Sequence, residues 1–310
     1  MIRRHRILVI GRNGQLARAL ADAEWPNLSQ VQFAGRDEID LFHAVQLRQQ
    51  LSSFNPEAII NTAGYANIEQ AELKPEAAFA LNAEAAHVLA TAAAMLDIPL
   101  LHLSSAHVFS GNKTEAYREG DRTEPLSVYG QSMLAGESAV QRARGRHLIL
   151  RSSRFFGRHG DNFLKTMLAQ GRDARELSFT ASGFACPTPV DALADMLPHI
   201  AIALIEGRRF APILHYAGDS AASWYEIATE VFSLARNYQP VPELVPLEMP
   251  AEAGAPARAS NLSLDCSMAR NLGLPKIDWR AALPPLVEAL CNPLSNPVAD
   301  QAARVPVQAA

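Results

Sequence analysis

The sequence predicts an α/β fold of the Rossmann type, a doubly wound parallel sheet with a smaller C-terminal lobe. Two observations carry this prediction. In the first half of the chain, short apolar segments alternate with segments of helical character, as in parallel sheets whose buried strands are joined by helices. A glycine pair, Gly11 and Gly14, directly follows the first apolar segment, where such folds turn from strand to helix.

The expected elements of the first half follow in chain order. Strands are expected where Leu, Ile and Val gather in short runs, at residues 6–11, 31–35, 57–64, 99–105 and 147–153. Helices are expected between and after them at residues 15–23, 43–54, 75–97 and 129–144. Pro75 favours a helix start, because the N–H that proline lacks has no partner in a first turn. Right-handed crossovers would then bring ligands to the carboxyl ends of the strands.

The alternation becomes less regular after about residue 155. Residues 1–155 are expected to form a dinucleotide-binding Rossmann domain, and residues 156–290 the remaining strands plus a substrate-binding lobe. Residues 241–260, rich in Pro and Ala, are expected to be loop with one edge strand, and residues 291–310 a disordered tail. Helices are expected in the second half at residues 162–171, 188–206, 223–238 and 278–290, with strands near 177–181 and 213–217.

Composition narrows the class of protein. The 310 residues are 48% hydrophobic and 19% charged, as in globular domains. The formal net charge of −4, with scattered Lys and Arg, argues against nucleic acid or an anionic membrane as the main partner. Cys186, Cys266 and Cys291 are widely spaced, which argues against a disulfide framework or a metal site. We therefore expect a soluble, cytoplasmic protein, and leave a homodimer or a partner enzyme open.

The glycine loop is the first candidate site. In "VIGRNGQLARAL", Gly11 and Gly14 let the backbone approach a pyrophosphate at the N-terminus of the next helix. A plain tight turn is the alternative. No acidic residue stands directly at the tip of the second strand, "FAGRDEID". Arg36, with Arg12, therefore favours NADP(H), and NAD(H) is the second candidate; the alternative is that both arginines are simply solvated.

Polar residues also follow the third and fourth strands, in "NTAGYANIEQAE" and "LSSAHVFSG". Ser104 and Ser105 either hydrogen-bond a substrate carbonyl or cap the chain locally. These stretches carry a resemblance, together with "GRNGQLARAL", "DEIDL", "PEAIINTAGYANIEQAELKPEAAFALNAEAA", "YREGDRTEPLSVYGQSMLAGE", "RSSRFFGRHGDNFLKTML", "ACPTPVDALADML", "SWYEIA", "RASNLSLD" and "DWRAAL". From about residue 6 to 290, the chain resembles the extended short-chain dehydrogenase/reductases of the dTDP-4-dehydrorhamnose reductase group.

The resemblance implies a sugar-nucleotide or other carbonyl substrate in a pocket between the sheet and the C-terminal lobe. It implies Tyr129, Ser105 and the substituted His107 as catalytic candidates, and Ser104, Arg154, Asn162 and Arg258 as substrate-binding candidates. The residues that the resemblance and the glycine loop assign to the cofactor are Gly11, Asn13, Gly14, Gln15, Leu16, Arg36, Asp40, Ala63, Gly64, Tyr65, Asn82 and Met133.

The chain departs from the family pattern at the residues expected to carry chemistry. In "YGQSM", Met133 replaces the lysine of the family's Tyr-x-x-x-Lys motif. Ala106 replaces a carboxylate, His107 an aromatic residue and Arg154 a tryptophan. Methionine offers neither charge nor donor, so Tyr129 would remain neutral and poorly tuned as an acid. His107 is either a substitute acid or a space-filling residue, and Arg154 either a fixed charge near the substrate or part of a surface ion pair.

Three functions remain compatible with this pattern. The favoured one is an NADP-dependent reductase of a 4-keto group on a nucleotide-linked sugar, or of a related carbonyl, with an altered proton relay. The second is a catalytically impaired protein that binds cofactor or sugar nucleotide and regulates a partner. The third is altered chemistry on another substrate, for which His107 and Arg154 are the positive indications.

Overall fold

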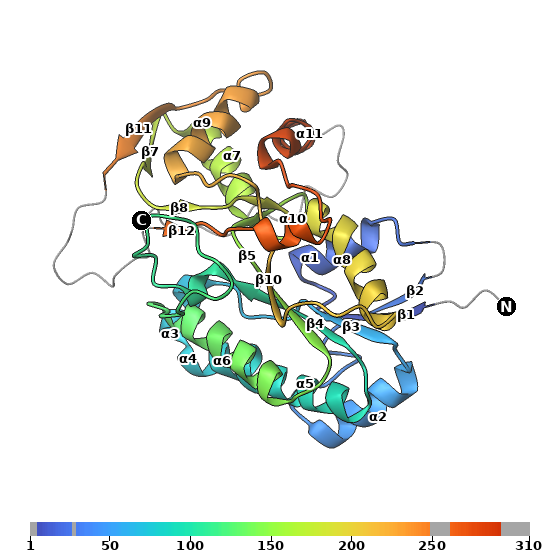
Figure 1. Cartoon of the computed structure of the whole chain (residues 1–310). Helices are drawn as coiled ribbons and strands as arrows, with labels where there is room; N and C mark the ends of the chain where they lie inside the picture. Colours follow the sequence, from blue (N-terminus) through green and yellow to red (C-terminus); the bar gives the residue numbers. More distant parts are fainter. Residues whose placement is uncertain (1–4, 27–28, 249–260, 293–310) are drawn as a thin grey trace.

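The computed structural model describes residues 5–26, 29–248 and 261–292. At its centre is a parallel sheet of six strands in the order β10-β5-β4-β3-β1-β2, seen nearly edge-on in the lower half of Figure 1. The sheet strands are β1 (His5–Ile10), β2 (Ser29–Ala34), β3 (Ala58–Asn61), β4 (Leu100–Ser105), β5 (His147–Ser152) and β10 (Ile213–His215). The predicted Rossmann-type parallel sheet is therefore confirmed.

The strand order places a switch point beside β1. This strand pairs in parallel with β2 on one side and with β3 on the other. The chain therefore builds one edge of the sheet with β2 and then crosses back to extend the sheet in the opposite direction from β3. A crevice opens outside the carboxyl ends of the strands at such a point, and doubly wound folds bind their ligands there. The loops after β1 and β3 meet at this crevice.

Helices cover both faces of the sheet. They are α1 (Gln15–Asp22), α2 (Ala44–Phe54), α3 (Ile68–Leu73), α4 (Pro75–Phe79), the π-helical turn η1 (Ala80–Glu84), α5 (Ala85–Met95), the 3₁₀ turn η2 (Ala106–Val108), α6 (Val128–Arg142), α7 (Phe163–Asp173), α8 (Val190–Ile205), α9 (Trp224–Ala235), α10 (Ser267–Asn271) and α11 (Trp279–Cys291). Helices α1 and α8 pack on one face, while α2, α5 and α6 pack on the other.

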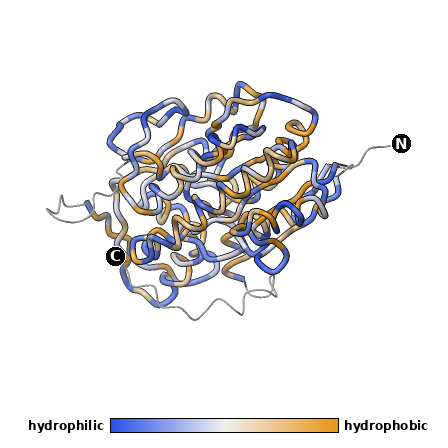
Figure 2. Tube along the Cα trace, turned by 90° about the horizontal axis from the view of Figure 1, so that it is seen from below, coloured by the Kyte–Doolittle hydropathy of each residue, from blue (hydrophilic) through white to orange (hydrophobic). Residues whose placement is uncertain are grey.

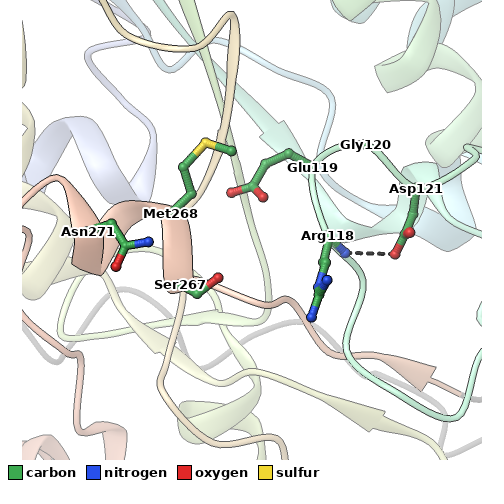
Figure 3. Close-up of a pocket in the computed structure, with 7 residues that line it drawn as sticks. All are labelled: Arg118, Glu119, Gly120, Asp121, Ser267, Met268 and Asn271. Atoms are coloured by element: carbon green, nitrogen blue, oxygen red, sulfur yellow. Dashed lines mark hydrogen bonds between the residues drawn. The ribbon is translucent and has the colours of Figure 1, made fainter.

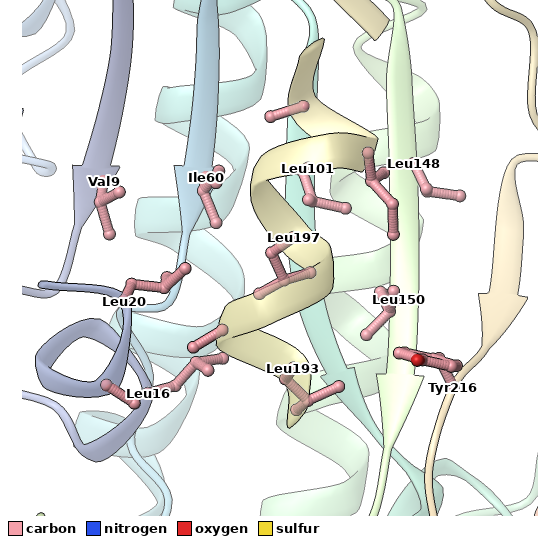
Figure 4. Packing of buried hydrophobic residues seen from close by; sticks show 14 of the residues in the cluster. Val9, Leu16, Leu20, Ile60, Leu101, Leu148, Leu150, Leu193, Leu197 and Tyr216 are labelled. Carbon is pink, nitrogen blue, oxygen red and sulfur yellow. The ribbon is translucent and has the colours of Figure 1, made fainter. Parts of the chain in front are cut away.

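Continuous apolar faces hold these layers together. In Figure 4, Leu193 and Leu197 of α8 lie over Leu101 of β4 and over Leu148 and Leu150 of β5. All five side chains are buried, so their packing removes apolar surface from water, the main favourable term in folding. Figure 2 shows hydrophobic segments running through the interior of the molecule, with hydrophilic segments on many of the outer loops.

The C-terminal lobe has a core of its own. Helices α7, α9 and α11 enclose a cluster that includes Phe156, Phe232 and Trp279, and they lie in the upper part of Figure 1. Its remaining strands are the short β6 (Phe155–Phe156), β7 (Glu176–Thr180), β8 (Phe184–Ala185), β9 (Thr188–Pro189), β11 (Glu243–Leu247) and β12 (Asn261–Leu262). The second half of the chain also contributes to the central sheet, with β10 as its edge strand and α8 packed on one face. The domain boundary at residue 155 stays a prediction.

Several elements differ from the sequence prediction. The helix expected at residues 75–97 is broken by the π turn η1, and the expected strand at 57–64 is shorter. Helices α3 and α10 were not predicted. The edge strand expected within 241–260 is β11, which pairs with β7; residues 249–260 and the predicted tail from residue 293 lie outside the described residues.

One described helical stretch, Pro75–Met95, has the length and apolar composition of a membrane-crossing helix. Its side chains Ala85, Leu89 and Ala93 pack in the cluster between α5 and the sheet. This packing accounts for its apolar composition.

Candidate active site

The glycine loop lies at the crevice beside β1, against the loop that follows β3. Gly11 has a positive φ of 101°, and a Cβ atom there would lie 2.7 Å from both the Ala63 nitrogen and the Thr62 Oγ1. Only glycine fits such a conformation and approach without strain. The Gly14 N–H donates to the Gly11 carbonyl over 2.8 Å, which closes the turn.

The start of α1 fits a pyrophosphate. No side chain caps this helix at Gly14, so its first N–H groups and its dipole remain available for an anion. Gly14 and Asn13 are exposed, whereas Leu16 is buried in the core and offers only its backbone. The glycine loop therefore presents an uncapped helix start at the crevice, and dinucleotide binding by these residues stays a prediction.

Asn82 holds the loop after β3 in place. Its Oδ1 accepts from the Tyr65 N–H over 2.7 Å, and its Nδ2 donates to the Tyr65 carbonyl and to the Ser132 Oγ. Asn82 lies in the π turn, a deformation frequent at functional sites. Since these bonds occupy its side chain, Asn82 shapes the loop that ends at Tyr65, and its role toward a cofactor stays a prediction.

Tyr129 and Ser105 lie together at the end of β4. Tyr129, in the first turn of α6, is hydrogen-bonded to the Ser105 side chain. Burial raises the pKa of Tyr129, and the bond with Ser105 opposes that rise. Tyr129 is therefore protonated at neutral pH. The spacing in the sequence placed both residues at strand and helix ends, and the structure brings them into contact.

Met133 follows Tyr129 by one turn of α6. Only 9% of its surface is exposed, and it belongs to an apolar cluster with Ala106, Val108 and Phe109. Tyr129 packs against the same cluster. The position of the family's lysine is therefore occupied by an apolar contact, and Met133 brings no charge to the tyrosine.

His107 packs edge-on against Tyr129, with ring centroids 5.5 Å apart. Burial, followed by the charge of Arg154, lowers the pKa of His107 to about 4. The imidazole is consequently neutral at pH 7 and carries no surplus proton for a substrate. This geometry favours the space-filling role that the sequence left open, and a catalytic role for His107 stays a prediction.

Arg154 forms no ion pair with a carboxylate of the described residues, in contrast to one of the alternatives left by the sequence. Its Nη1 donates to the Ala222 carbonyl over 2.8 Å, and its guanidinium lies 4.0 Å from the centroid of the Trp224 ring. Its φ of 42° is unusual for a residue other than glycine. Burial lowers the pKa of Arg154 to about 10, so it remains charged at neutral pH. It places a fixed cation near His107, where β5 passes into the lobe.

The other predicted substrate residues have different surroundings. Ser104 is buried and donates to Glu137 Oε1 over 2.5 Å, so its hydroxyl hydrogen is engaged within the protein. Asn162 caps α7 and donates to Gln15 Oε1 over 2.8 Å, which links the lobe to the start of α1. Roles in substrate binding stay predictions for both, and Arg258 lies outside the described residues.

The loop after β2 corrects one expectation. The sequence indicated no acid at this strand tip, but Glu38 folds back so that its Oε2 accepts from the Gly35 N–H over 2.8 Å and its Oε1 pairs with Arg12. Arg36 is exposed. The Asp40 carboxylate accepts from the Phe42 N–H and pairs with a neighbouring histidine, so its own loop engages it. The signal in the sequence for this contact is Glu38 itself, an acidic residue three positions after Gly35.

A pocket of about 520 Å³ lies elsewhere, between the loop at residues 118–121 and α10. Figure 3 shows its lining residues: Arg118, Glu119, Gly120, Asp121, Ser267, Met268 and Asn271. Its charged side chains already have protein partners, since Arg118 pairs with Asp265, Asp121 with Lys113, and Glu119 accepts from the His215 N–H. None of the predicted site residues lines it.

The six-stranded parallel sheet, with a glycine loop after β1 and Tyr129 next to Ser105 at the end of β4, is the architecture of an extended short-chain dehydrogenase/reductase. The chain belongs to the family described as the RmlD substrate binding domain, whose model matches residues 5–292. It is 35% identical to the dTDP-4-dehydrorhamnose reductase of Sinorhizobium fredii, over 92% of this chain and 97% of that protein. It is 34% identical to the enzyme of that name from Aggregatibacter actinomycetemcomitans, over 90% and 97% of the two chains.

A solved structure shows the same architecture. The dTDP-4-dehydrorhamnose reductase of Bacillus anthracis, in complex with NADP, superposes with a TM-score of 0.82 at 28% identity, covering 91% of this chain and 98% of that chain. The resemblance inferred from the motifs is thereby confirmed.

Proposed function

We propose that this protein is an NADP(H)-dependent oxidoreductase that reduces the 4-keto group of a nucleotide-linked sugar, as its relatives' name, dTDP-4-dehydrorhamnose reductase, indicates. The observation that carries the proposal is the hydrogen-bonded pair Tyr129 and Ser105. An acid–base tyrosine beside a second hydroxyl suits proton transfer to a carbonyl oxygen. The NADP complex of the Bacillus anthracis protein supports the cofactor assignment.

Each residue of the pair has a distinct task. Bound NADPH would supply the hydride to the carbonyl carbon. Tyr129 donates its phenolic proton to the carbonyl oxygen, and Ser105 hydrogen-bonds Tyr129 and orients it. The raised pKa keeps Tyr129 protonated, which is the state that reduction requires. Arg154 supplies a positive charge for an anionic group of the substrate, held by its contacts with Ala222 and Trp224.

The substitution by Met133 makes a non-catalytic binding protein the rival proposal. The relatives give it no support, because they carry the reductase name. In the direction of reduction, the proton donor must be a neutral tyrosine. Met133 brings no charge and leaves Tyr129 neutral, so replacing the lysine does not remove the protonation state that reduction requires.

Cofactor titration and turnover test the proposal together. Protein fluorescence is titrated with NADPH and with NADH, and then again in the presence of a dTDP-sugar. We expect NADPH to bind and to be oxidised on addition of a dTDP-linked 4-keto sugar. NADPH binding without oxidation would favour the rival proposal, and no binding of either cofactor would exclude the reductase and leave a protein that binds only a sugar nucleotide.

The pH dependence of turnover should reflect the missing lysine. Because reduction uses protonated Tyr129 and burial raises its pKa, kcat/KM should not fall between pH 7 and about 10. In Met133→Lys, an ammonium one turn from Tyr129 should lower the tyrosine pKa by about 1–3 units. The alkaline loss of kcat/KM should then begin at a lower pH than in the wild-type protein.

The matched control is Met133→Leu, which keeps the apolar contact with Ala106 and Phe109 and should keep the wild-type profile. A wild-type rate that already declines between pH 7 and about 9 would contradict the assignment of Tyr129 as a donor of raised pKa.

A further inference from the structure

An acidic residue in the loop after β2 and an arginine in the loop after β1 form an ion pair, Glu38 with Arg12. Arg12 directly follows Gly11, and its guanidinium pairs with Glu38. The two loops are adjacent because β1 and β2 are paired up to Ile10 and Ala34, and the Arg12 N–H donates to the Ala34 carbonyl. The pair is thus fixed at the carboxyl edge of the sheet, next to the dinucleotide loop.

Glu38 is held more firmly than its neighbour Asp37. Its second carboxylate oxygen accepts from the Gly35 N–H over 2.8 Å, whereas Asp37 reaches Arg12 only at 3.8 Å and is 87% exposed. The bond from Gly35, followed by the interaction with Arg12, lowers the pKa of the Glu38 carboxyl. Glu38 is therefore ionised at neutral pH.

This position is where a Rossmann fold distinguishes its two cofactors. An acid at the end of the second strand accepts the ribose 2′-hydroxyl of NAD, and an arginine receives the 2′-phosphate of NADP. In this chain the acid, Glu38, and the arginine, Arg12, are both present and form an ion pair with each other. A 2′-phosphate would meet the negative charge of Glu38 and would have to displace it from Arg12, whereas a ribose hydroxyl would find an acceptor already in place. Arg36, in the same loop, is exposed and makes no ion pair with the described residues.

We propose that Glu38 sets the preference between the two cofactors, by accepting the ribose hydroxyls of NADH and by competing with the 2′-phosphate of NADPH for Arg12. The inference rests on the proposed function, in which a nicotinamide dinucleotide binds the loop at Gly11 and Gly14. It assigns to Glu38, which the sequence did not single out, the restraint on NADPH.

The experiment measures dissociation constants of the full-length protein for NADH and NADPH by fluorescence. Since the two cofactors differ only at the 2′-phosphate, their ratio cancels effects of a substitution on folding or on the rest of the site. In Glu38→Gln the ratio should shift toward NADPH by about 10-fold or more, as expected for a charge-assisted bond exchanged between partners. Asp37→Asn removes the same charge from the same loop and should shift it by less than about 2-fold.

A second substitution shows whether the effect passes through Arg12. Adding Arg12→Met to Glu38→Gln should abolish most of the gain for NADPH, because the released guanidinium is what the phosphate would use. Equal shifts in Glu38→Gln and Asp37→Asn, or an unchanged ratio in Glu38→Gln, would overturn the inference while leaving the proposed function intact. Failure of the wild-type protein to bind either cofactor would overturn both.

Discussion

Replacing Tyr129 by phenylalanine is expected to lower kcat for NADPH-dependent reduction by about 10²- to 10⁴-fold, the usual contribution of a positioned acid–base group. The phenol is bonded to Ser105, and the other titratable group beside it is His107, whose pKa of about 4 leaves it without a proton to give. Removing the hydroxyl oxygen therefore leaves the carbonyl without a donor among these side chains. Stopped-flow or steady-state NADPH oxidation measures the loss.

Two controls separate chemistry from structure. The dissociation constant for NADPH should change little in Tyr129→Phe, because the phenolic oxygen acts on the substrate. Tyr216→Phe removes another buried phenol, one that donates to the Pro275 carbonyl and belongs to the core beneath α8, and it should keep the wild-type kcat. If Tyr129→Phe retains more than about a tenth of the wild-type kcat, another group supplies the proton.

The fold was predictable because it depends on local patterns. Most of the sheet strands contain a short apolar run, β2 alternates polar and apolar residues, and Gly11 marks the turn after the first strand. The π turn could not be predicted in the same way, because its cause is tertiary. A Cβ atom at Gly136 would lie 2.1 Å from the Asn82 carbonyl oxygen, so α6 packs directly on this turn. The helical period of residues 75–97 is the same with or without such a turn.

The candidate site likewise contains contacts that the sequence indicated and contacts that it did not. Motif spacing indicated Tyr129 and Ser105, which the structure brings into contact. It did not indicate that Glu38 folds back onto Gly35, because this depends on how a loop curls. Motif spacing also did not show that Ser104 and Ser105 have different partners. Ser104 meets its partner Glu137, 33 residues away, only once β4 and α6 are packed together.

Removing one partner of the buried pair of Glu137 and Arg151 is expected to destabilise the protein strongly. Arg151 on β5 donates to both carboxylate oxygens of Glu137, over 2.7 and 2.6 Å, and the two side chains are only 3% and 2% exposed. Ser104 donates to the same carboxylate. Glu137 lies on α6, the helix of Tyr129, and Ser104 precedes Ser105. The Glu137 carboxylate therefore joins the helix of Tyr129 to β5 through Arg151 and to β4 through Ser104.

Arg151→Met keeps the length of the side chain but leaves the Glu137 carboxylate buried without its cation. We expect the free energy of unfolding in urea to fall by about 3–5 kcal/mol, as when one partner of a buried ion pair is removed. Arg122→Met is the matched control, because its pair with Glu124 is exposed and should contribute no more than about 1 kcal/mol.

The double variant Glu137→Gln with Arg151→Met decides how the loss arises. A neutral glutamine still accepts from Ser104 and no longer carries a charge into the core, so the double variant should recover about 1–3 kcal/mol relative to Arg151→Met alone. Recovery would show that the uncompensated carboxylate, and not lost packing of the arginine against Phe109, causes the instability. If Arg151→Met costs no more than Arg122→Met, water must reach the Glu137 carboxylate, and the pair would not be what holds α6 against β5.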